Sequence, residues 1–188
     1  MPKVDILLEG SMKDVGENRY EARTTMSLIR GESNIVVDTG NLGQEQQLLR
    51  ALEMFDLRPH EVQHVVLTHT CPDHHQNNFI FTHAKFIDGT SIYGFGSEYY
   101  VWQGDEYEIE KGVTVVRLPG HTPYDVTVFV ETEQGVVAVA GDLFFWKDDF
   151  EYSSKFAWDI EKLKKSREEV IKRADFIIPG HGPQFAAK

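Results

Sequence analysis

The chain has 188 residues, of which 41% are hydrophobic and 26% are charged, and this composition is typical of a folded globular protein rather than a disordered one. Its net charge of −11 argues against non-specific binding to nucleic acid or to an anionic membrane, and its one cysteine cannot form an internal disulfide. No apolar run approaches the roughly 18 residues that a membrane span needs, and the first ten residues lack a signal-peptide pattern, so we expect one domain over residues 1–188 in the reducing cytoplasm.

Short β-rich segments and two clear helices follow in chain order. The predicted strands cover residues 4–8, 24–29, 35–37, 65–67, 85–87, 91–95, 114–117, 127–130, 136–140 and 176–178. A helix is predicted over residues 44–57 from the spacing of its leucines, and another from the capping residue Asp159 to about Arg173. Residues 11–23 are expected to form a polar loop. Strands interleaved with helices predict an α/β (α+β) fold in which helices cover stacked sheets.

Polar side chains follow five of these strands in tight turns. They are Asp38, His69, His121, Asp142 and His181. Strand ends hold short side chains rigidly and can aim them at a shared point, which is what a metal site requires. This pattern predicts that the five turns converge.

The densest group of metal-ligand residue types is the run of residues 69–75, whose sequence is HTCPDHH. His69 and Cys71 can project the same way from an extended turn and bind one ion, while Asp73 and His74 face a second position. Imidazole, thiolate and carboxylate all bind Zn²⁺ well. The alternative is a polar loop that contains histidines by chance, but three histidines, an aspartate and the one cysteine within seven residues favour a metal site.

This run resembles the H-x-H-x-D-H signature of the metallo-β-lactamase superfamily. The other superfamily motifs follow in order as VVDTG, LPGHTPYD, AVAGDLFF and IIPGHGPQF, so that the resemblance covers nearly the whole chain. The segments VDILLEG, GHTPYDVTVFV and KSREEVIKRADFIIPGHGPQF further resemble the compact group of metallo-β-lactamase domain-containing protein 1.

The resemblance implies an αββα four-layer sandwich with a dinuclear metal site at one edge. By motif position, the first ion would be held by His69, Cys71 and His121 and the second by Asp73, His74 and His181, with Asp142 bridging both. Asp38 would support the site from behind the ligands. Two such ions would activate a metal-bound hydroxide that hydrolyses the substrate. Asp73 would orient the attacking water and transfer its proton.

Cys71 departs from the superfamily signature, which has histidine at that position. It is expected to coordinate as a thiolate, although a weakly filled first site or a site without hydrolytic activity are open alternatives. A thiolate would make the ion a weaker Lewis acid and raise the pKa of bound water. The mixture of ligands favours zinc, as one or two ions, with iron or manganese as alternatives.

We expect a metal-dependent hydrolase that acts on an ester, thioester, lactone or related small molecule. The aromatic segment 143–158 would either wall the substrate pocket or pack the following helix, and residues 11–23 and 93–107 would form other walls or a homodimer contact. A phosphodiesterase or endoribonuclease is the first alternative, although the net charge disfavours RNA. The second alternative is a non-catalytic metal-binding or redox-sensing protein in which Cys71 is the sensing group.

Overall fold

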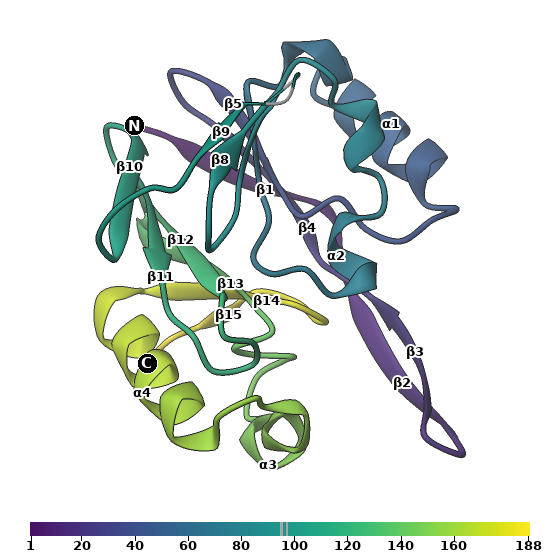
Figure 1. The fold of residues 1–188 in the computed structure, drawn as a ribbon, viewed down its shortest axis with the longest axis vertical. Helices are drawn as coiled ribbons and strands as arrows, with labels where there is room; N and C mark the ends of the chain where they lie inside the picture. The colour runs from purple at the N-terminus through teal and green to yellow at the C-terminus, as the bar shows by residue number, and fades with distance from the viewer. Residues whose placement is uncertain (95, 97) are drawn as a thin grey trace.

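Two β-sheets lie face to face in the computed structural model, which describes residues 1–94, 96 and 98–188 (Figure 1). Within these residues, the first sheet has seven strands in the order β1 (Lys3–Leu8), β4 (Met26–Arg30), β5 (Asn34–Val37), β6 (His64–Val66), β7 (Lys85–Ile87), β8 (Ile92–Tyr93) and β9 (Tyr99–Tyr100). The second has six strands in the order β10 (Glu106–Glu110), β11 (Val113–Arg117), β12 (Val126–Thr132), β13 (Gly135–Gly141), β14 (Phe176–Pro179) and β15 (Phe185–Ala186). None of the helices in the described residues is long and apolar enough to cross a membrane.

Helices cover the outer face of each sheet, which gives the predicted αββα arrangement. Helix α1 (Glu45–Glu53) lies outside the first sheet, and α4 (Ile160–Arg173) lies outside the second (Figure 1). The shorter helical segments are α2 (Pro72–His75), α3 (Phe150–Ser153), η1 (Pro59–Glu61), η2 (Asn78–Ile80) and η3 (Ser154–Phe156). Asp159 caps α4 as predicted, because its side chain accepts a hydrogen bond from the amide of Lys162.

Three apolar clusters correspond to the three interfaces between these four layers. Alternating strand residues such as Val37 and Val128 fill the space between the sheets. The opposite faces of the same strands meet α1 through Leu48 on one side and α4 through Leu163 on the other. Each sheet is therefore buried on both faces, which explains why the central strands are almost continuously apolar in sequence.

The main error of the sequence prediction concerns residues 11–23. They form a hairpin of β2 (Ser11–Gly16) and β3 (Arg19–Arg23), not a loop, and Figure 1 shows this hairpin projecting from the body of the molecule. Its residues are mostly exposed, so neither strand carries the apolar alternation on which strand prediction depends. The predicted strand 91–95 is observed as the shorter β8, and Phe95 lies outside the described residues.

Candidate metal centre

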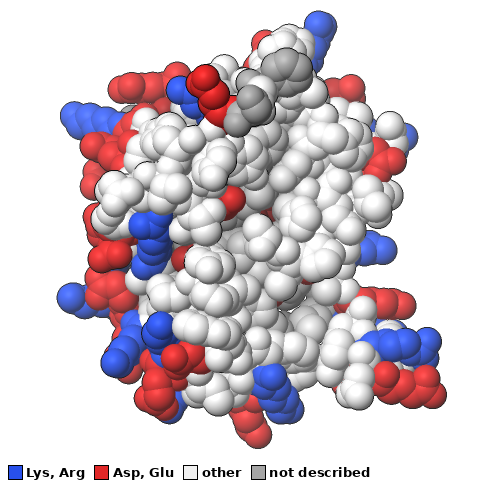
Figure 2. Space-filling view, in the orientation of Figure 1, with Lys and Arg blue, Asp and Glu red and all other residues white. Residues whose placement is uncertain are grey.

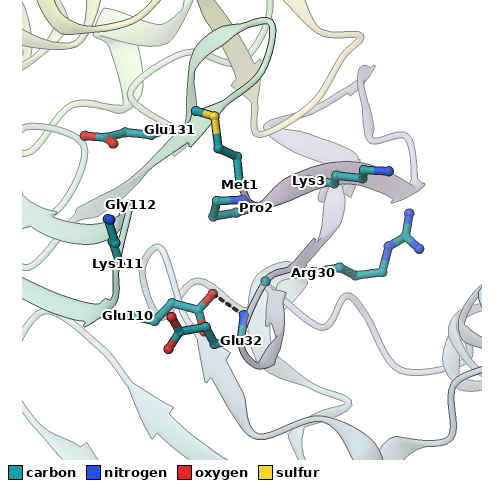
Figure 3. A pocket seen from close by; sticks show the side chains of 10 residues that line it. Met1, Pro2, Lys3, Arg30, Glu32, Glu110, Lys111, Gly112 and Glu131 are labelled. Atoms are coloured by element: carbon teal, nitrogen blue, oxygen red, sulfur yellow. Dashed lines mark hydrogen bonds between the residues drawn. The ribbon is translucent and has the colours of Figure 1, made fainter.

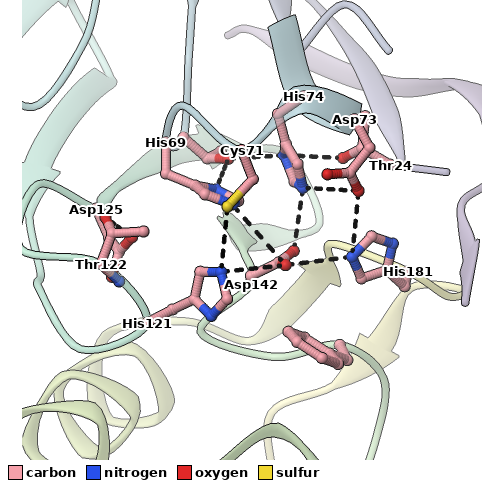
Figure 4. Close-up of polar contacts among 12 residues, drawn as sticks. Thr24, His69, Cys71, Asp73, His74, His121, Thr122, Asp125, Asp142 and His181 are labelled. Carbon is pink, nitrogen blue, oxygen red and sulfur yellow. Dashed lines mark hydrogen bonds and ion pairs between the residues drawn. The ribbon is translucent and has the colours of Figure 1, made fainter. Parts of the chain in front are cut away.

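Turns from both sheets converge on one group of seven side chains (Figure 4). The segment after β6 and the first turn of α2 supply His69, Cys71, Asp73 and His74, while the turns after β11, β13 and β14 supply His121, Asp142 and His181. The ligand atoms fall into three overlapping sets, each lying within 4.8 Å: His69–Cys71–His121, His69–His74–Asp142 and Asp73–His74–His181.

The first set surrounds a point between the ends of β6 and β11. The thiol sulfur of Cys71 lies 3.7 Å from Nε2 of His121, and that nitrogen lies 3.6 Å from Oδ2 of Asp142. Nε2 of His69 lies 3.9 Å from the same oxygen. Two imidazoles, a thiol and a carboxylate therefore face one another across distances that a single ion can span.

The other two sets share His74, and Figure 4 shows Asp73, His74 and His181 on the other side of Asp142 from Cys71 and His121. Nε2 of His74 and Nε2 of His181 each lie 3.6 Å from Oδ2 of Asp73 and 3.2 Å from the Asp142 carboxylate. Asp142 thus lies between both groups of ligand-type atoms, with one oxygen 3.2 Å from His74 and the other facing His69, His121 and His181.

Three of the four histidines are fixed through the ring nitrogen that points away from the centre. Nδ1 of His74 lies 2.8 Å from Oδ2 of Asp38, whose carboxylate also accepts hydrogen bonds from the amide and hydroxyl of Thr68. Nδ1 of His181 lies 2.9 Å from the backbone carbonyl oxygen of Arg23, and Nδ1 of His69 lies 3.2 Å from the Thr68 hydroxyl. Such contacts orient the rings so that Nε2 faces the centre.

Four of the atoms that face the centre are buried and lack hydrogen-bond partners among the described residues. They are Nε2 of His69 and His74, Oδ2 of Asp73 and Oδ1 of Asp142. Buried polar atoms are normally satisfied, because an unpaired one costs about 1–3 kcal/mol. Four such atoms converging on one place fit a bound cation, so the residues present are compatible with the metal that this type of site requires.

The charges of the cluster are strongly coupled. Burial lowers the pKa of His69 well below its usual value, and it also lowers the pKa of His121. Burial opposes protonation of His74 and His181 too, but nearby carboxylates outweigh it and raise the pKa of both. These two rings in turn hold the pKa of Asp142 well below its usual range despite burial. The metal-free centre therefore keeps positive charge on the side of His74 and His181.

Comparison with known proteins places this geometry in a family. The chain is 38% identical to metallo-β-lactamase domain-containing protein 1 of Xenopus laevis over an alignment of 189 positions, which covers 97% of this chain and 80% of the frog protein. It belongs to the metallo-β-lactamase domain-containing protein 1 family. No protein-family model matches the chain.

More distant relatives share the fold. A metallo-β-lactamase-type protein of Thermotoga maritima has a TM-score of 0.77 at 18% identity, with 98% of this chain and 99% of that protein covered. The N-acyl homoserine lactonase of Bacillus thuringiensis is 28% identical over 73% of this chain and 63% of its own length. A mutant of the B. thuringiensis lactonase, solved with N-decanoyl-L-homoserine bound at its active site, has a TM-score of 0.71 at 21% identity, covering 96% of this chain and 92% of the lactonase. The chain thus has the metallo-β-lactamase fold, as predicted.

The aromatic segment after Asp142 packs the following helix, as one of the two predictions stated, and one of its rings also reaches the candidate centre. Phe144 is buried against Phe185 and under the guanidinium of Arg167, so it packs α4 onto the second sheet. Phe145 is equally buried, but its ring lies edge-on to the His121 and His181 rings, with centroids 5.8 and 5.2 Å away. Phe145 therefore forms an apolar floor beneath the candidate centre.

Two cavities differ in whether their lining includes residues of the candidate centre. A cavity of about 750 Å³ includes Asp73 in its lining and runs between the β2–β3 hairpin and residues 41–47, where its walls are largely polar. Beside it, the Tyr20 ring meets the Phe156 ring at 5.2 Å, so the hairpin touches the aromatic segment. The other cavity, of about 450 Å³, lies around Met1, Arg30 and Glu110 and includes none of the seven residues (Figure 3). Only the first of these two includes a residue of the candidate centre in its lining.

Sequence reasoning missed several groups that shape the centre. The crossover from β3 to β4 supplies the Arg23 carbonyl for His181 and the Thr24 hydroxyl, which lies 3.0 Å from Nδ1 of His74. Asp125, which lies just before β12, binds the turn that carries His121. A backbone carbonyl leaves no sequence signal, whereas Asp125 is visible in the motif LPGHTPYD. His60, His75 and His83 lie outside the three sets of ligand-type atoms.

Proposed function

We propose that this chain is a metal-dependent hydrolase that binds one or two zinc ions and cleaves an ester, thioester, lactone or related bond in a small molecule. The observation that carries the proposal is the convergence of seven ligand-type side chains from both sheets, with four of their buried polar atoms lacking a hydrogen-bond partner among the described residues. In this proposal His69, Cys71 and His121 hold one ion, Asp73, His74 and His181 hold the other, and Asp142 lies between them.

Zinc is the proposed metal because thiolate and imidazole ligands together bind zinc better than they bind harder ions. A site made of imidazoles and carboxylates alone, such as the one around His74 and His181, would also accept iron or manganese. Cys71 must lose its proton before it can bind, so binding at the first site should release a proton and strengthen with rising pH.

The bound metal would supply an activated water and stabilise negative charge on the carbonyl oxygen of the substrate. The protein would supply the position and the proton transfer. Asp73 is the ligand-type residue that lines the site cavity, and its carboxylate is the group we assign to accept the proton of the attacking water and to return it to the leaving group. The buried ring of Phe145 would keep bulk water away from the opposite side.

A small substrate is proposed because the cavity beside Asp73 is bounded by the hairpin and because the lactonase relative acts on a small lactone. On the face shown in Figure 2, acidic and basic side chains are mixed around the rim and the middle is largely uncharged, so that face offers no continuous basic track for RNA. The cytoplasmic location and the homodimer contact stay predictions.

The first test combines metal analysis with an activity panel. Purified protein should contain one or two equivalents of zinc and should hydrolyse at least one member of a panel of aryl esters, thioesters and N-acyl homoserine lactones. His74→Ala should lose metal and activity, whereas the neighbouring His75→Ala should keep both, since His75 lies outside the candidate centre. Equal metal content in the two variants would contradict the proposed ligand set.

Adding single-stranded RNA to the panel separates the alternatives. Cleavage of single-stranded RNA that falls steeply between low and moderate salt would indicate the endoribonuclease function, because phosphate contacts release counterions, whereas hydrolysis of a neutral ester should change little. A fully zinc-loaded protein that is silent on every substrate would indicate the non-catalytic alternative. Cys71→His should lower the pH at which hydrolysis reaches half its maximum, and an unchanged profile would contradict a thiolate ligand.

A further inference from the structure

His121 is held differently from the other histidines of the candidate centre. The Nδ1 atoms of His69, His74 and His181 contact Thr68, Asp38 and the Arg23 carbonyl. Nδ1 of His121 is buried and has no hydrogen-bond partner among the described residues. The ring of His121 is therefore not oriented through its far nitrogen, and its position depends on the backbone of its own turn.

Asp125 holds that backbone on both sides of His121 (Figure 4). Its Oδ2 accepts hydrogen bonds from the amide of Gly120 at 2.9 Å and from the amide of Thr122 at 2.8 Å, and its Oδ1 accepts one from the Thr122 hydroxyl. The residue is only 4% exposed, so these bonds are protected from competing water. One side chain thus binds the backbone amides of the residues immediately before and after a proposed ligand.

The carbonyl groups of the same turn are bound from the other side. The amides of Trp158 and Asp159 donate to the carbonyl oxygens of His121 and Gly120, at 2.9 and 3.1 Å, and the Ser166 hydroxyl donates to the carbonyl of Pro119. The chain leading into α4 therefore fixes the carbonyls, while Asp125 fixes the amides. Without Asp125, the amides of Gly120 and Thr122 would lose the carboxylate that fixes the orientation of the His121 turn relative to Cys71.

We infer that Asp125 is a positioning residue that aligns His121 with Cys71 and thereby sets the affinity of the first metal position. This inference rests on the proposed function, because it takes His69, Cys71 and His121 as the ligands of one ion. It assigns no contact between Asp125 and substrate or metal. Groups that orient a ligand in this way typically contribute about 10- to 100-fold to metal affinity.

Cobalt(II) titration of the metal-free protein tests the inference without using activity. A thiolate–cobalt charge-transfer absorption reports the Cys71 position, while the d–d bands report both positions. In Asp125→Asn the dissociation constant of the charge-transfer event should rise about tenfold or more, and binding at the His74–His181 position should not change. Asp175→Asn is the matched control, since Asp175 likewise accepts a backbone hydrogen bond, from Val136, but lies outside the centre.

The possible results of the cobalt titration distinguish a failure of the Asp125 inference from a failure of the proposed metal ligands. A wild-type protein without a charge-transfer band would overturn the inference together with the proposed ligand set of the first ion, because Cys71 would then not bind the metal. A wild-type band that titrates identically in Asp125→Asn would overturn the inference alone. So would equal weakening at both positions, which would indicate a general loss of structure. If Asp125→Asn does not fold, Thr122→Val replaces it: this variant loses one donor to Asp125 and should weaken the same event by a smaller factor, whereas wild-type affinity would overturn the inference.

Discussion

Cys71 differs from the histidines around it because it must change its charge before it can bind a metal. Burial and, to a smaller extent, the carboxylates of Asp142 and Asp73 raise the pKa of its thiol to about 11, against the opposing effect of His74. At neutral pH the metal-free protein therefore carries a neutral thiol at this position. The fold alone does not create a reactive thiolate here; the ion would have to do so.

This charge state predicts slow alkylation of Cys71 in the metal-free protein. At about pH 8 the fraction of thiolate should be roughly a hundredfold smaller than for an unperturbed cysteine, since each pKa unit changes it tenfold. The rate with iodoacetamide, measured by mass spectrometry after chelation, should keep rising as the pH approaches 11, the value to which burial raises the pKa of Cys71. Cys71 is the one cysteine, so Cys71→Ser gives the background rate. A rate that levels off near about pH 8 would contradict this account.

At the scale of elements, the turns of the candidate centre depend on close packing against their neighbours. Gly120 lies against α4, and a Cβ atom added there would come within 2.7 Å of the backbone nitrogen of Leu163 and still closer to its Cα. Backbone atoms inside a helix cannot move aside as a flexible side chain can. The helix and the His121 turn are therefore packed at a distance that only glycine allows.

Gly120→Ala should accordingly destabilise the protein by about 2 kcal/mol, which is the usual cost of forcing extra volume into a packed interface. The measurement is urea denaturation of the metal-free protein, so that a change in metal affinity does not contribute. Gly94→Ala is the control, because the nearest atom to its added Cβ, the carbonyl oxygen of Ala84, lies at 3.8 Å. Equal midpoints for the two variants would show that α4 can move without cost.

The elements also show how far the sequence could predict this structure. Five strands are short, mostly apolar and mostly buried, so they were predictable together with the turns that follow them. These strands precede Asp38, His69, His121, Asp142 and His181. The β2–β3 hairpin was not predictable, because its side chains are exposed and pack against little. The helix predicted over residues 44–57 is observed only over Glu45–Glu53, since residues beyond it turn toward Pro59.

The groups behind the ligands were harder to predict than the ligands themselves. The ligand-type residues carry a spacing in the sequence, but the contact between the Arg23 carbonyl and His181 joins residues 158 positions apart. A backbone atom can be contributed by any residue type, so only the folded topology places it. The same holds for Thr24, which reaches His74 because β4 pairs with β5 in the first sheet.

At the scale of the whole molecule, the candidate centre joins the two halves of the sandwich. His69, Cys71, Asp73 and His74 follow a strand of the first sheet, and His121, Asp142 and His181 follow strands of the second. A metal held by both groups would bind the native arrangement and not the unfolded chain. Its binding free energy should therefore appear as stability of the entire fold, and not only as local order in the turns.

Removal of the metal should thus lower the thermal unfolding temperature of the whole protein. With free zinc at about 1,000 times its dissociation constant, the expected stabilisation is about 4 kcal/mol, or about 10 °C for a chain of this size. Differential scanning calorimetry with and without a chelator measures the shift. His181→Ala should lose part of it, because the second sheet would then hold the ion beside Asp73 through Asp142 alone, whereas His60→Ala, outside the candidate centre, should keep it. A full zinc-dependent shift in His181→Ala would mean that His181 does not help to hold the ion.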